Sequence, residues 1–402
     1  MVAIGQPVTG IDCLRVCTRR APKDGWLTIT FSACSRCGGD TIVVTHPDGS
    51  IRPGYRLNKA LLGGKETKVA ELSRKIVVLG ANSFSGQDFV DLLLDDPRNC
   101  VVGISRSAER TDLFLRYRLR NELSRYRYEQ LDLNRDLDRL LDLLDDERPA
   151  WLVNFAAQSE VAPSWEHPEH WFQTNTVALA RLVNHLRRQA YLERYLHVSS
   201  PEVYGTCRGT VTESAPLRPS TPYAASKAAA DLLLETYRRQ FDFPLLTVRA
   251  TNVYGARQQL FKIVPRTAIY LRMQRPIQLH GGGTAVKSYI HVRDVSRGEL
   301  AILERGEIGR LYHLSPDQGI AVRDVVRQMC ELQGVAWERA VQMVGERPGQ
   351  DAAYVIDSTL ARSTLAWRPQ VEWSAGLREV LAWVDQYWEE IQREPLEYGH
   401  RE

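Results

Sequence analysis

Two residues four positions apart, Tyr223 and Lys227, have the types and the spacing that alcohol oxidation needs from a base, although such a pair also recurs by chance on ordinary surface helices. They lie in the segment PYAASKAAADLL, whose alanines and leading proline predict a helix. Side chains at positions i and i+4 share one helical face, so the phenol and the ammonium are neighbours. A nearby ammonium favours the phenolate, and we expect Lys227 to lower the pKa of Tyr223 from about 10. Such a phenol can accept a proton from a substrate hydroxyl.

The segment RYLHVSSPEVYG precedes this helix and reads as a strand that ends in the polar residues Ser199, Ser200 and Glu202. Further strands are expected in KIVVLG, CVVGIS, YEQLDL, WLVNFAA and LLTVRA, with amphipathic helices between them. This alternation predicts an α/β fold with a doubly wound parallel Rossmann sheet. Because ligands bind at the carboxyl ends of such strands, we expect Ser200, Glu202 and Tyr223 to meet at one edge.

The first strand, around residues 76–79, is followed by a turn framed by Gly80 and Gly86. A glycine turn between a strand and a helix lets backbone amides approach a pyrophosphate, and Ser83 stands where a middle glycine is expected. The second strand ends at Ser105 and Arg106, with no acidic residue to hold a ribose hydroxyl. A guanidinium suits a 2′-phosphate, so we expect an NAD(P) site that favours NADP.

We expect three regions: a Cys-rich N-terminal extension over 1–70, an NAD(P)-binding domain over 74–255, and a smaller mixed α/β substrate-binding domain over 256–395 that interleaves with it. In the extension, four cysteines are arranged as C-x3-C and C-x2-C, a pattern that can hold a structural zinc ion, with four free thiols as the alternative. These cysteines are Cys13, Cys17, Cys34 and Cys37.

The chain has 402 residues, 44% hydrophobic and 25% charged, which is ordinary for a globular protein. A net charge of +3 argues against a dedicated nucleic-acid binder. No run of about 18 apolar residues and no signal-peptide pattern is present, so we expect a cytoplasmic protein without a membrane partner.

From about residue 74 to 390 the chain resembles the extended short-chain dehydrogenase/reductases, and within them the dTDP-glucose and GDP-mannose 4,6-dehydratases. The resemblance rests on NFAAQSEV, SSPEVYG, PYAASKAAADLL, NVYG, LFKIVP, GGGTAVKSYIHVRDV and RPGQD, which follow the family's order and spacing. It implies a nucleotide-sugar lyase that acts on a hexose of a nucleoside diphosphate, and a homodimer formed through the Tyr223 helix and the helix of Asn175.

By that resemblance, Tyr223, Lys227 and Ser200 oxidise C4 of the sugar, and Glu202 removes the C5 proton. Water then leaves from C6, and hydride returns to C6. The family's binding residues correspond to two groups of residues in this sequence, one for the cofactor and one for the substrate. The cofactor group is Gly80, Ser83, Phe84, Ser85, Gly86, Ser105, Arg106, Asp132, Leu133, Ala156, Ala157 and Gln158, together with Tyr223 and Lys227. The substrate group is Ser159, Asn252, Lys262, Lys287 and Arg347.

One departure is Pro201, which stands where the dTDP-glucose enzymes carry an acid for the leaving C6 hydroxyl. A Glu-only site is chemically sufficient if Glu202 passes the C5 proton to that hydroxyl. Other C4-oxidising enzymes remain as alternatives: a 4-epimerase, a UDP-glucuronate decarboxylase and a 5,6-dehydratase. A non-enzyme alternative is a dinucleotide-sensing scaffold that kept the fold.

Overall fold

The structure is a computed structural model that describes residues 73–206, 209–345 and 355–400 in full. It describes the backbone alone for residues 353–354 and for four strands near the N-terminus. The chain divides into two units, Met1–Glu71 and Leu72–Glu402.

The first unit contains one antiparallel sheet in the order β1-β2-β3-β4. Its strands are β1 (Leu14–Arg20), β2 (Trp26–Cys34), β3 (Gly39–Thr45) and β4 (Ile51–Arg56). Cys17 lies on β1 and Cys34 ends β2, and nothing of their side chains is described. Cys13 and Cys37 lie outside the described residues, so the expected zinc site does too.

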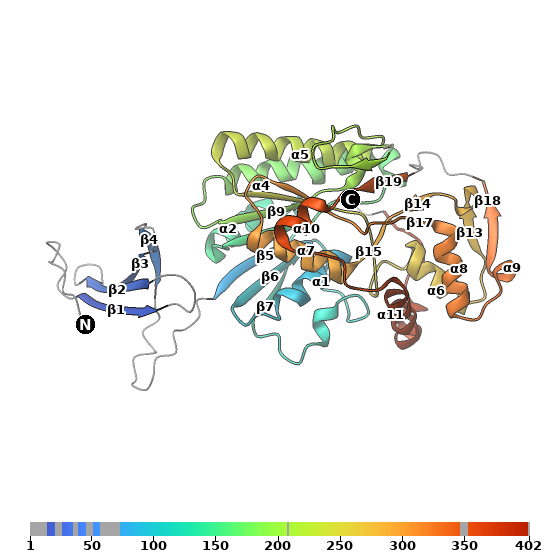
Figure 1. The fold of residues 1–402 in the computed structure, drawn as a ribbon, viewed down its shortest axis with the longest axis horizontal. Helices are drawn as coiled ribbons and strands as arrows, with labels where there is room; N and C mark the ends of the chain where they lie inside the picture. Colours follow the sequence, from blue (N-terminus) through green and yellow to red (C-terminus); the bar gives the residue numbers. More distant parts are fainter. Residues whose placement is uncertain are drawn as a thin grey trace. The chain divides into compact units, whose positions relative to one another are not determined.

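The second unit is built on a seven-stranded parallel sheet in the order β16-β11-β9-β8-β5-β6-β7 (Figure 1). The order reverses at β5, between β6 and β8, which creates the switch point where doubly wound folds bind ligands. The predicted fold class is confirmed. The strands are β5 (Arg74–Leu79), β6 (Asn99–Ser105), β7 (Tyr126–Gln130), β8 (Trp151–Asn154), β9 (Arg194–Val198), β11 (Leu245–Ala250) and β16 (Leu311–Leu314).

Alternate residues of β5 point to opposite faces of the sheet, as a period of two requires. Ile76 and Val78 pack in one core cluster, which also holds residues of α1 and α7, while Val77 and Leu79 pack in another with residues of α2, α4 and α5. Helices therefore cover both faces, and all four strand residues are buried. The helices are α1 (Phe84–Leu93), α2 (Leu137–Glu147), α4 (Leu179–Leu186), α5 (Pro222–Phe241) and α7 (Val292–Arg305).

Residues after 251, together with Leu113 and Phe114, form a third core cluster, and the later residues also return to the large sheet through α7 and β16. The smaller part contains short strand pairs, β12 with β15 and β13 with β18, and the mixed sheet β10-β19-β14-β17. Its helices are α6 (Ile263–Arg272), α8 (Val322–Leu332), α9 (Trp337–Ala340), α10 (Thr359–Leu365), α11 (Trp373–Gln386) and α12 (Trp388–Ile391). Its strands are β10 (Thr210–Val211), β12 (Asn252–Tyr254), β13 (Ile277–His280), β14 (Val286–Lys287), β15 (Tyr289–His291), β17 (Ile320–Ala321), β18 (Val341–Val344) and β19 (Ala353–Ile356).

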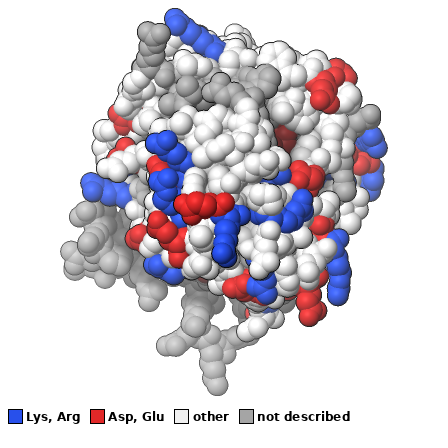
Figure 2. All heavy atoms as spheres, turned by 90° about the vertical axis from the view of Figure 1, so that its right-hand side faces the viewer, with Lys and Arg blue, Asp and Glu red and all other residues white. Residues whose placement is uncertain are grey.

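On the molecular face that includes α8, α9 and β18, acidic and basic side chains are interspersed, with no large field of one sign in view (Figure 2). In the part of the chain that the structure describes, no helix is both long enough and apolar enough to cross a membrane.

Candidate active site

Helix α5 presents Tyr223 and Lys227 as the sequence predicts. The helix begins after Thr221, whose hydroxyl accepts a hydrogen bond from the Ala224 amide at 3.1 Å, and Pro222 fills its first turn. Tyr223 is 9% exposed and Lys227 is 3% exposed. The Lys227 ammonium donates to the Val198 carbonyl at 2.8 Å, which fastens the helix to the carboxyl end of β9.

The expectation that Lys227 lowers the pKa of Tyr223 is wrong for this structure. Burial raises the pKa of Tyr223 above its usual range, and the Glu202 charge raises it further, while a hydrogen bond with Ser200 opposes both. Burial also lowers the pKa of Lys227 to about 8, although the Asp231 charge opposes that shift. The spacing of Tyr223 and Lys227 shows that their charges can interact, but it does not show that the phenol is buried.

Ser200 and Glu202 meet Tyr223 at the end of β9. Ser200 caps a short 3-10 helix, Pro201–Tyr204, and its hydroxyl accepts from the Glu202 amide at 3.2 Å. The Glu202 carboxylate is half-buried and close enough to raise the pKa of Tyr223. Pro201 is buried and has no side-chain donor. The site therefore joins a phenol, a hydroxyl, an ammonium and a carboxylate, which can serve both O–H and C–H deprotonation.

The turn before α1 brings backbone atoms so close to Gly80 and Gly86 that a side chain at either position would clash. Gly80 has φ +84°, and a Cβ there would lie 2.8 Å from the Ala156 nitrogen. A Cβ on Gly86 would lie 2.3 Å from the Gly80 carbonyl oxygen. The Ser83 hydroxyl accepts from the Gly86 amide at 3.0 Å and so caps α1, whose first turn has no acidic residue. The turn fits the pyrophosphate of a dinucleotide, because it leaves a positive helix end open at the sheet's switch point.

The expected ribose-binding region lies beside this turn. The Ser105 hydroxyl accepts from the Asn82 amide at 2.9 Å, and Arg106 is exposed beyond the end of β6. The Asp132 carboxylate accepts from the Asn134 amide at 2.7 Å, which fixes the turn after β7. The remaining expected cofactor residues are part of these same segments: Phe84 and Ser85 in the first turn of α1, Leu133 beside Asp132, and Ala156, Ala157 and Gln158 after β8.

Asn175 joins the strand end after β8 to helix α5. It lies buried in a π-helical turn, Gln173–Ala178, between α3 (Pro168–Phe172) and α4. Its carbonyl oxygen accepts from the Gln158 amide at 2.8 Å, and its side-chain amide donates to the Gln158 carbonyl and to the Ser226 hydroxyl, each at 3.0 Å. Such single π turns are frequent at functional sites. The carboxamide thus positions Gln158 and α5 together.

A cleft of about 450 Å³ is lined mostly by residues of the smaller part, and the expected substrate residues Asn252, Lys262 and Lys287 are among them. Glu160 also lines it, and its carboxylate lies 2.7 Å from the Lys262 ammonium. The sequence argument missed Glu160, although it directly follows the expected Ser159, which is exposed. Arg347 lies outside the described residues.

A buried charge cluster lies next to the candidate catalytic residues. The Asp231 carboxylate, one turn after Lys227, accepts from the Ser199 hydroxyl and from the Arg249 guanidinium, each at 2.6 Å. His197 approaches the second carboxylate oxygen at 3.5 Å. Burial alone would raise the pKa of Asp231, but His197 and Arg249 hold it well below its usual range. Asp231 therefore remains an anion beneath Lys227, and the sequence argument did not single it out.

Comparison with known proteins decides which family uses this arrangement. The model of the family described as GDP-mannose 4,6 dehydratase matches residues 77–380 of the chain. The chain belongs to this dehydratase family. The match covers residues of both the Rossmann sheet and the cleft, so the predicted membership in the extended short-chain dehydrogenase/reductases is confirmed.

Relatives of this dehydratase include the dTDP-glucose 4,6-dehydratase of Neisseria gonorrhoeae, 29% identical over 338 residues, which covers 78% of this chain and 96% of that protein. The human dTDP-D-glucose 4,6-dehydratase is 28% identical over 316 residues, covering 77% of this chain and 89% of the relative. A trifunctional UDP-glucose 4,6-dehydratase, epimerase and reductase of Arabidopsis thaliana is 32% identical over 248 residues, or 61% of this chain. The chain spans 37% of that longer relative.

Among solved structures, the dTDP-glucose 4,6-dehydratase of Streptomyces venezuelae with NAD and TYD bound superposes with a TM-score of 0.72 at 28% identity. The match covers 78% of this chain and 97% of that one. The UDP-glucuronic acid 4-epimerase of Bacillus cereus also shares the fold, with a TM-score of 0.70 at 24% identity, covering 78% and 99%. The fold alone therefore does not separate dehydration from epimerisation, and the residues of the site must do so.

Proposed function

We propose that this protein is an NDP-hexose 4,6-dehydratase that forms an NDP-4-keto-6-deoxyhexose, with Tyr223 as the base that takes the C4 hydroxyl proton. Ser200 holds the phenol through a hydrogen bond that opposes the rise in the pKa of Tyr223, and the buried ammonium of Lys227 keeps a positive charge one helical turn from the phenol. A bound nicotinamide dinucleotide supplies the hydride acceptor at C4 and the hydride donor at C6.

The observation that carries this proposal is Glu202, a half-buried carboxylate close to Tyr223 at the end of β9. A 4-epimerase needs only the phenol, ammonium and hydroxyl, whereas dehydration needs a base for the C5 proton that the C4 ketone acidifies. Glu202 takes that proton and passes it to the leaving C6 hydroxyl, so one water molecule is lost. When hydride reaches C6, a proton from solvent replaces the one lost from C5. This single-residue route agrees with Pro201, which has no proton to give.

For the substrate, we propose that Lys262, Lys287 and Asn252 hold a nucleoside diphosphate in the cleft, with Arg347 as a further cation. Lys262 and Lys287 supply point charges for the phosphates. Since Lys262 is paired with Glu160 in the structure, a diphosphate must compete with that carboxylate for the ammonium. The nucleotide base and the sugar's C2 substituent are left to experiment.

We propose NADP as the preferred cofactor. Arg106 is exposed just beyond the end of β6, and Ser105, Arg106 and Ser107 offer no carboxylate that would repel a 2′-phosphate. The Streptomyces relative binds NAD, so the test compares the dissociation constants of both cofactors. NADP binds more tightly if the proposal holds, and Arg106→Ala removes that preference.

We propose a homodimer through α5 and the Asn175 helix. Leu232 on α5 is 61% exposed and Val177 before α4 is 46% exposed, which leaves apolar side chains on both helices without cover in one copy. Light scattering of Leu232→Glu against the wild type tests this, since a charge in an apolar interface weakens association. A dimer of unchanged stability in the variant contradicts the assignment.

We also propose that Cys13, Cys17, Cys34 and Cys37 bind a structural zinc ion, since four thiolates leave no open position for catalysis. Elemental analysis of the purified chain tests this, and zinc well below one equivalent rejects it.

The test of the activity uses dTDP-glucose, GDP-mannose, UDP-glucose, UDP-GlcNAc and CDP-glucose, with mass spectrometry for loss of water. Glu202→Gln should still oxidise C4, seen as reduced nicotinamide, but release no water. Glu193→Gln is the matched control, because this exposed glutamate precedes the same strand at its other end. No 4-keto product from any of these substrates contradicts the proposal and leaves the scaffold alternative. Loss of CO₂ from UDP-glucuronate indicates a decarboxylase instead.

A further inference from the structure

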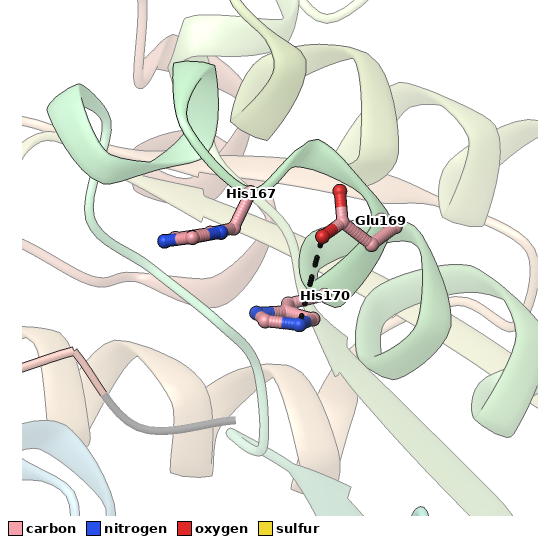
Figure 3. Close-up of side chains that lie close together, drawn as sticks. All are labelled: His167, Glu169 and His170. Atoms are coloured by element: carbon pink, nitrogen blue, oxygen red, sulfur yellow. Dashed lines mark ion pairs between the residues drawn. The ribbon is translucent and has the colours of Figure 1, made fainter.

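Three ionisable side chains that the proposed catalysis does not use gather at the start of α3. His167 precedes the helix, and Glu169 and His170 lie in its first turn. One donor atom of each lies within 4.8 Å of the others. Figure 3 shows the Glu169 carboxylate and the His170 ring facing each other, with the His167 ring nearby.

Imidazole nitrogens and a carboxylate oxygen are the donors that borderline divalent metals such as Zn²⁺ prefer. Tetrahedral donors about 2.1 Å from such an ion lie about 3.4 Å from one another. The Nε2 atom of His170 is 3.7 Å from the Glu169 carboxylate, which is close to that spacing. Glu169 is exposed, so its side chain can rotate by the remaining distance without disturbing the core. The His167 ring is already stacked on the rings of His170 and His400, with centroids 5.2 Å apart in each pair.

A second observation comes from the other end of the sequence. The Nδ1 atom of His170 is 2.9 Å from Nε2 of His400, while its Nε2 atom faces Glu169. Metal-binding histidines usually use one ring nitrogen for the ion and hydrogen-bond through the other, which fixes the ring and its tautomer. His400 is in turn stacked on the buried Trp171, with ring centroids 5.1 Å apart, and its Nδ1 is 3.3 Å from the Tyr398 hydroxyl.

We propose that His167, Glu169 and His170 bind a divalent transition-metal ion of the zinc class, and that His400 orients His170 for this role. Three protein donors leave the remaining coordination positions to water. The site is independent of the four N-terminal cysteines and of the proposed dehydratase activity.

The position of the site suggests what the ion does. The segment 397–400 connects it to the substrate cleft, because the Tyr398 ring packs edge-on against Phe261 at 5.4 Å, and Phe261 lines the cleft. Glu397 accepts hydrogen bonds from Arg266 and Tyr270 of α6. Since metal binding fixes His170, it strengthens the contact with His400 and holds the C-terminal segment against the cleft wall.

The experiment titrates the chelator-treated full chain with Co²⁺ and Zn²⁺ by calorimetry and absorption. The wild type should bind one more equivalent of metal per chain than a His167→Ala/His170→Ala double variant. The absorption spectrum of this additional Co²⁺ should lack the thiolate charge-transfer bands of a cysteine site. His185→Ala is the matched control, because His185 is also a histidine paired with a carboxylate, Asp145, at 2.9 Å. His400→Ala should weaken binding about 10-fold to 100-fold, as loss of an outer partner does.

Equal stoichiometry in the wild type and the double variant overturns the site, as does binding only at Zn²⁺ concentrations on the order of 1 mM. The site is also overturned if the His185→Ala control loses as much metal as the double variant. Unchanged affinity in His400→Ala overturns the role of the C-terminal segment. Hydrogen exchange over residues 396–400 adds a readout besides affinity: Zn²⁺ should slow it in the wild type and leave it unchanged in the double variant.

Discussion

Replacing Asp231 by asparagine removes the negative charge next to Lys227. The loss should appear both in folding stability and in the pH dependence of catalysis. Asp231 is the anion of a buried cluster in which its side chain is 8% exposed and that of Arg249 is 5% exposed. Removing one partner of a buried ion pair costs about 3–5 kcal/mol of folding free energy, and Asn keeps one acceptor oxygen, so we expect about 3 kcal/mol. Urea unfolding measures this loss directly.

The same substitution should change the pH dependence of catalysis. The pKa of Lys227 is about 8 in the native protein, where burial lowers it and the Asp231 charge opposes the fall. A nearby opposite charge is worth about 1–3 pKa units, so the pKa of Lys227 should fall by at least about 1 in Asp231→Asn. Because kcat/KM reports groups of the free enzyme, its alkaline limb should move from near pH 8 to about one unit lower.

Two control variants test whether the buried charge of Asp231 causes these effects. Asp138→Asn makes the same chemical change at a side chain that is 91% exposed and 3.7 Å from Arg181, and it should move neither stability nor the alkaline limb. Ser199→Ala removes a hydrogen bond to Asp231 without removing its charge, so it should cost about 1 kcal/mol and leave the limb in place. An alkaline limb in Asp231→Asn that coincides with the wild type, in a folded protein, refutes the role assigned to Asp231.

Further predictions concern the base, the phosphate site and the linkage of Lys227 to folding. Tyr223→Phe should reduce kcat at least about 100-fold in a spectrophotometric assay of nicotinamide reduction, and retained turnover contradicts the mechanism. Lys262→Ala should raise KM more than it lowers kcat, because it removes a contact made equally in ground and transition states, whereas the exposed Arg275→Ala should change neither. Between pH 8 and 10 the unfolded chain holds a proton that folded Lys227 has released, so stability should rise by about 2 kcal/mol in urea unfolding. Lys227→Met should abolish that rise.

The sequence predicts the parts of this molecule that depend on local pattern. The alternation of strands and helices gives the parallel sheet, and the segment SSPEVYG places Ser200 and Glu202 at a strand end. The helix containing Tyr223 and Lys227 follows from its proline and its alanines, and the structure adds the Thr221 cap. Each of these features depends on residues that are close together in the sequence, so one segment contains the whole pattern that predicts it.

What the sequence does not reveal depends on distant segments that only the fold brings together. Glu160 meets Lys262 across about a hundred residues, and Asp231 meets Arg249 beneath the strand ends. His400 meets His170 from the far end of the chain. The pKa of Tyr223 was also predicted in the wrong direction, because burial of the phenol outweighs charge proximity and burial is not visible in residue spacing.

The central claim is that one hydride leaves C4 and returns to C6 of the same sugar while Glu202 exchanges the C5 proton. The most direct test uses an NDP-hexose deuterated at C4, incubated in ordinary water, and a second sample of unlabelled substrate in D₂O. We predict deuterium at C6 in the first product, deuterium at C5 in the second, and loss of one water in both. Deuterium that stays at C4 of an epimerised sugar, with no loss of water, contradicts the claim.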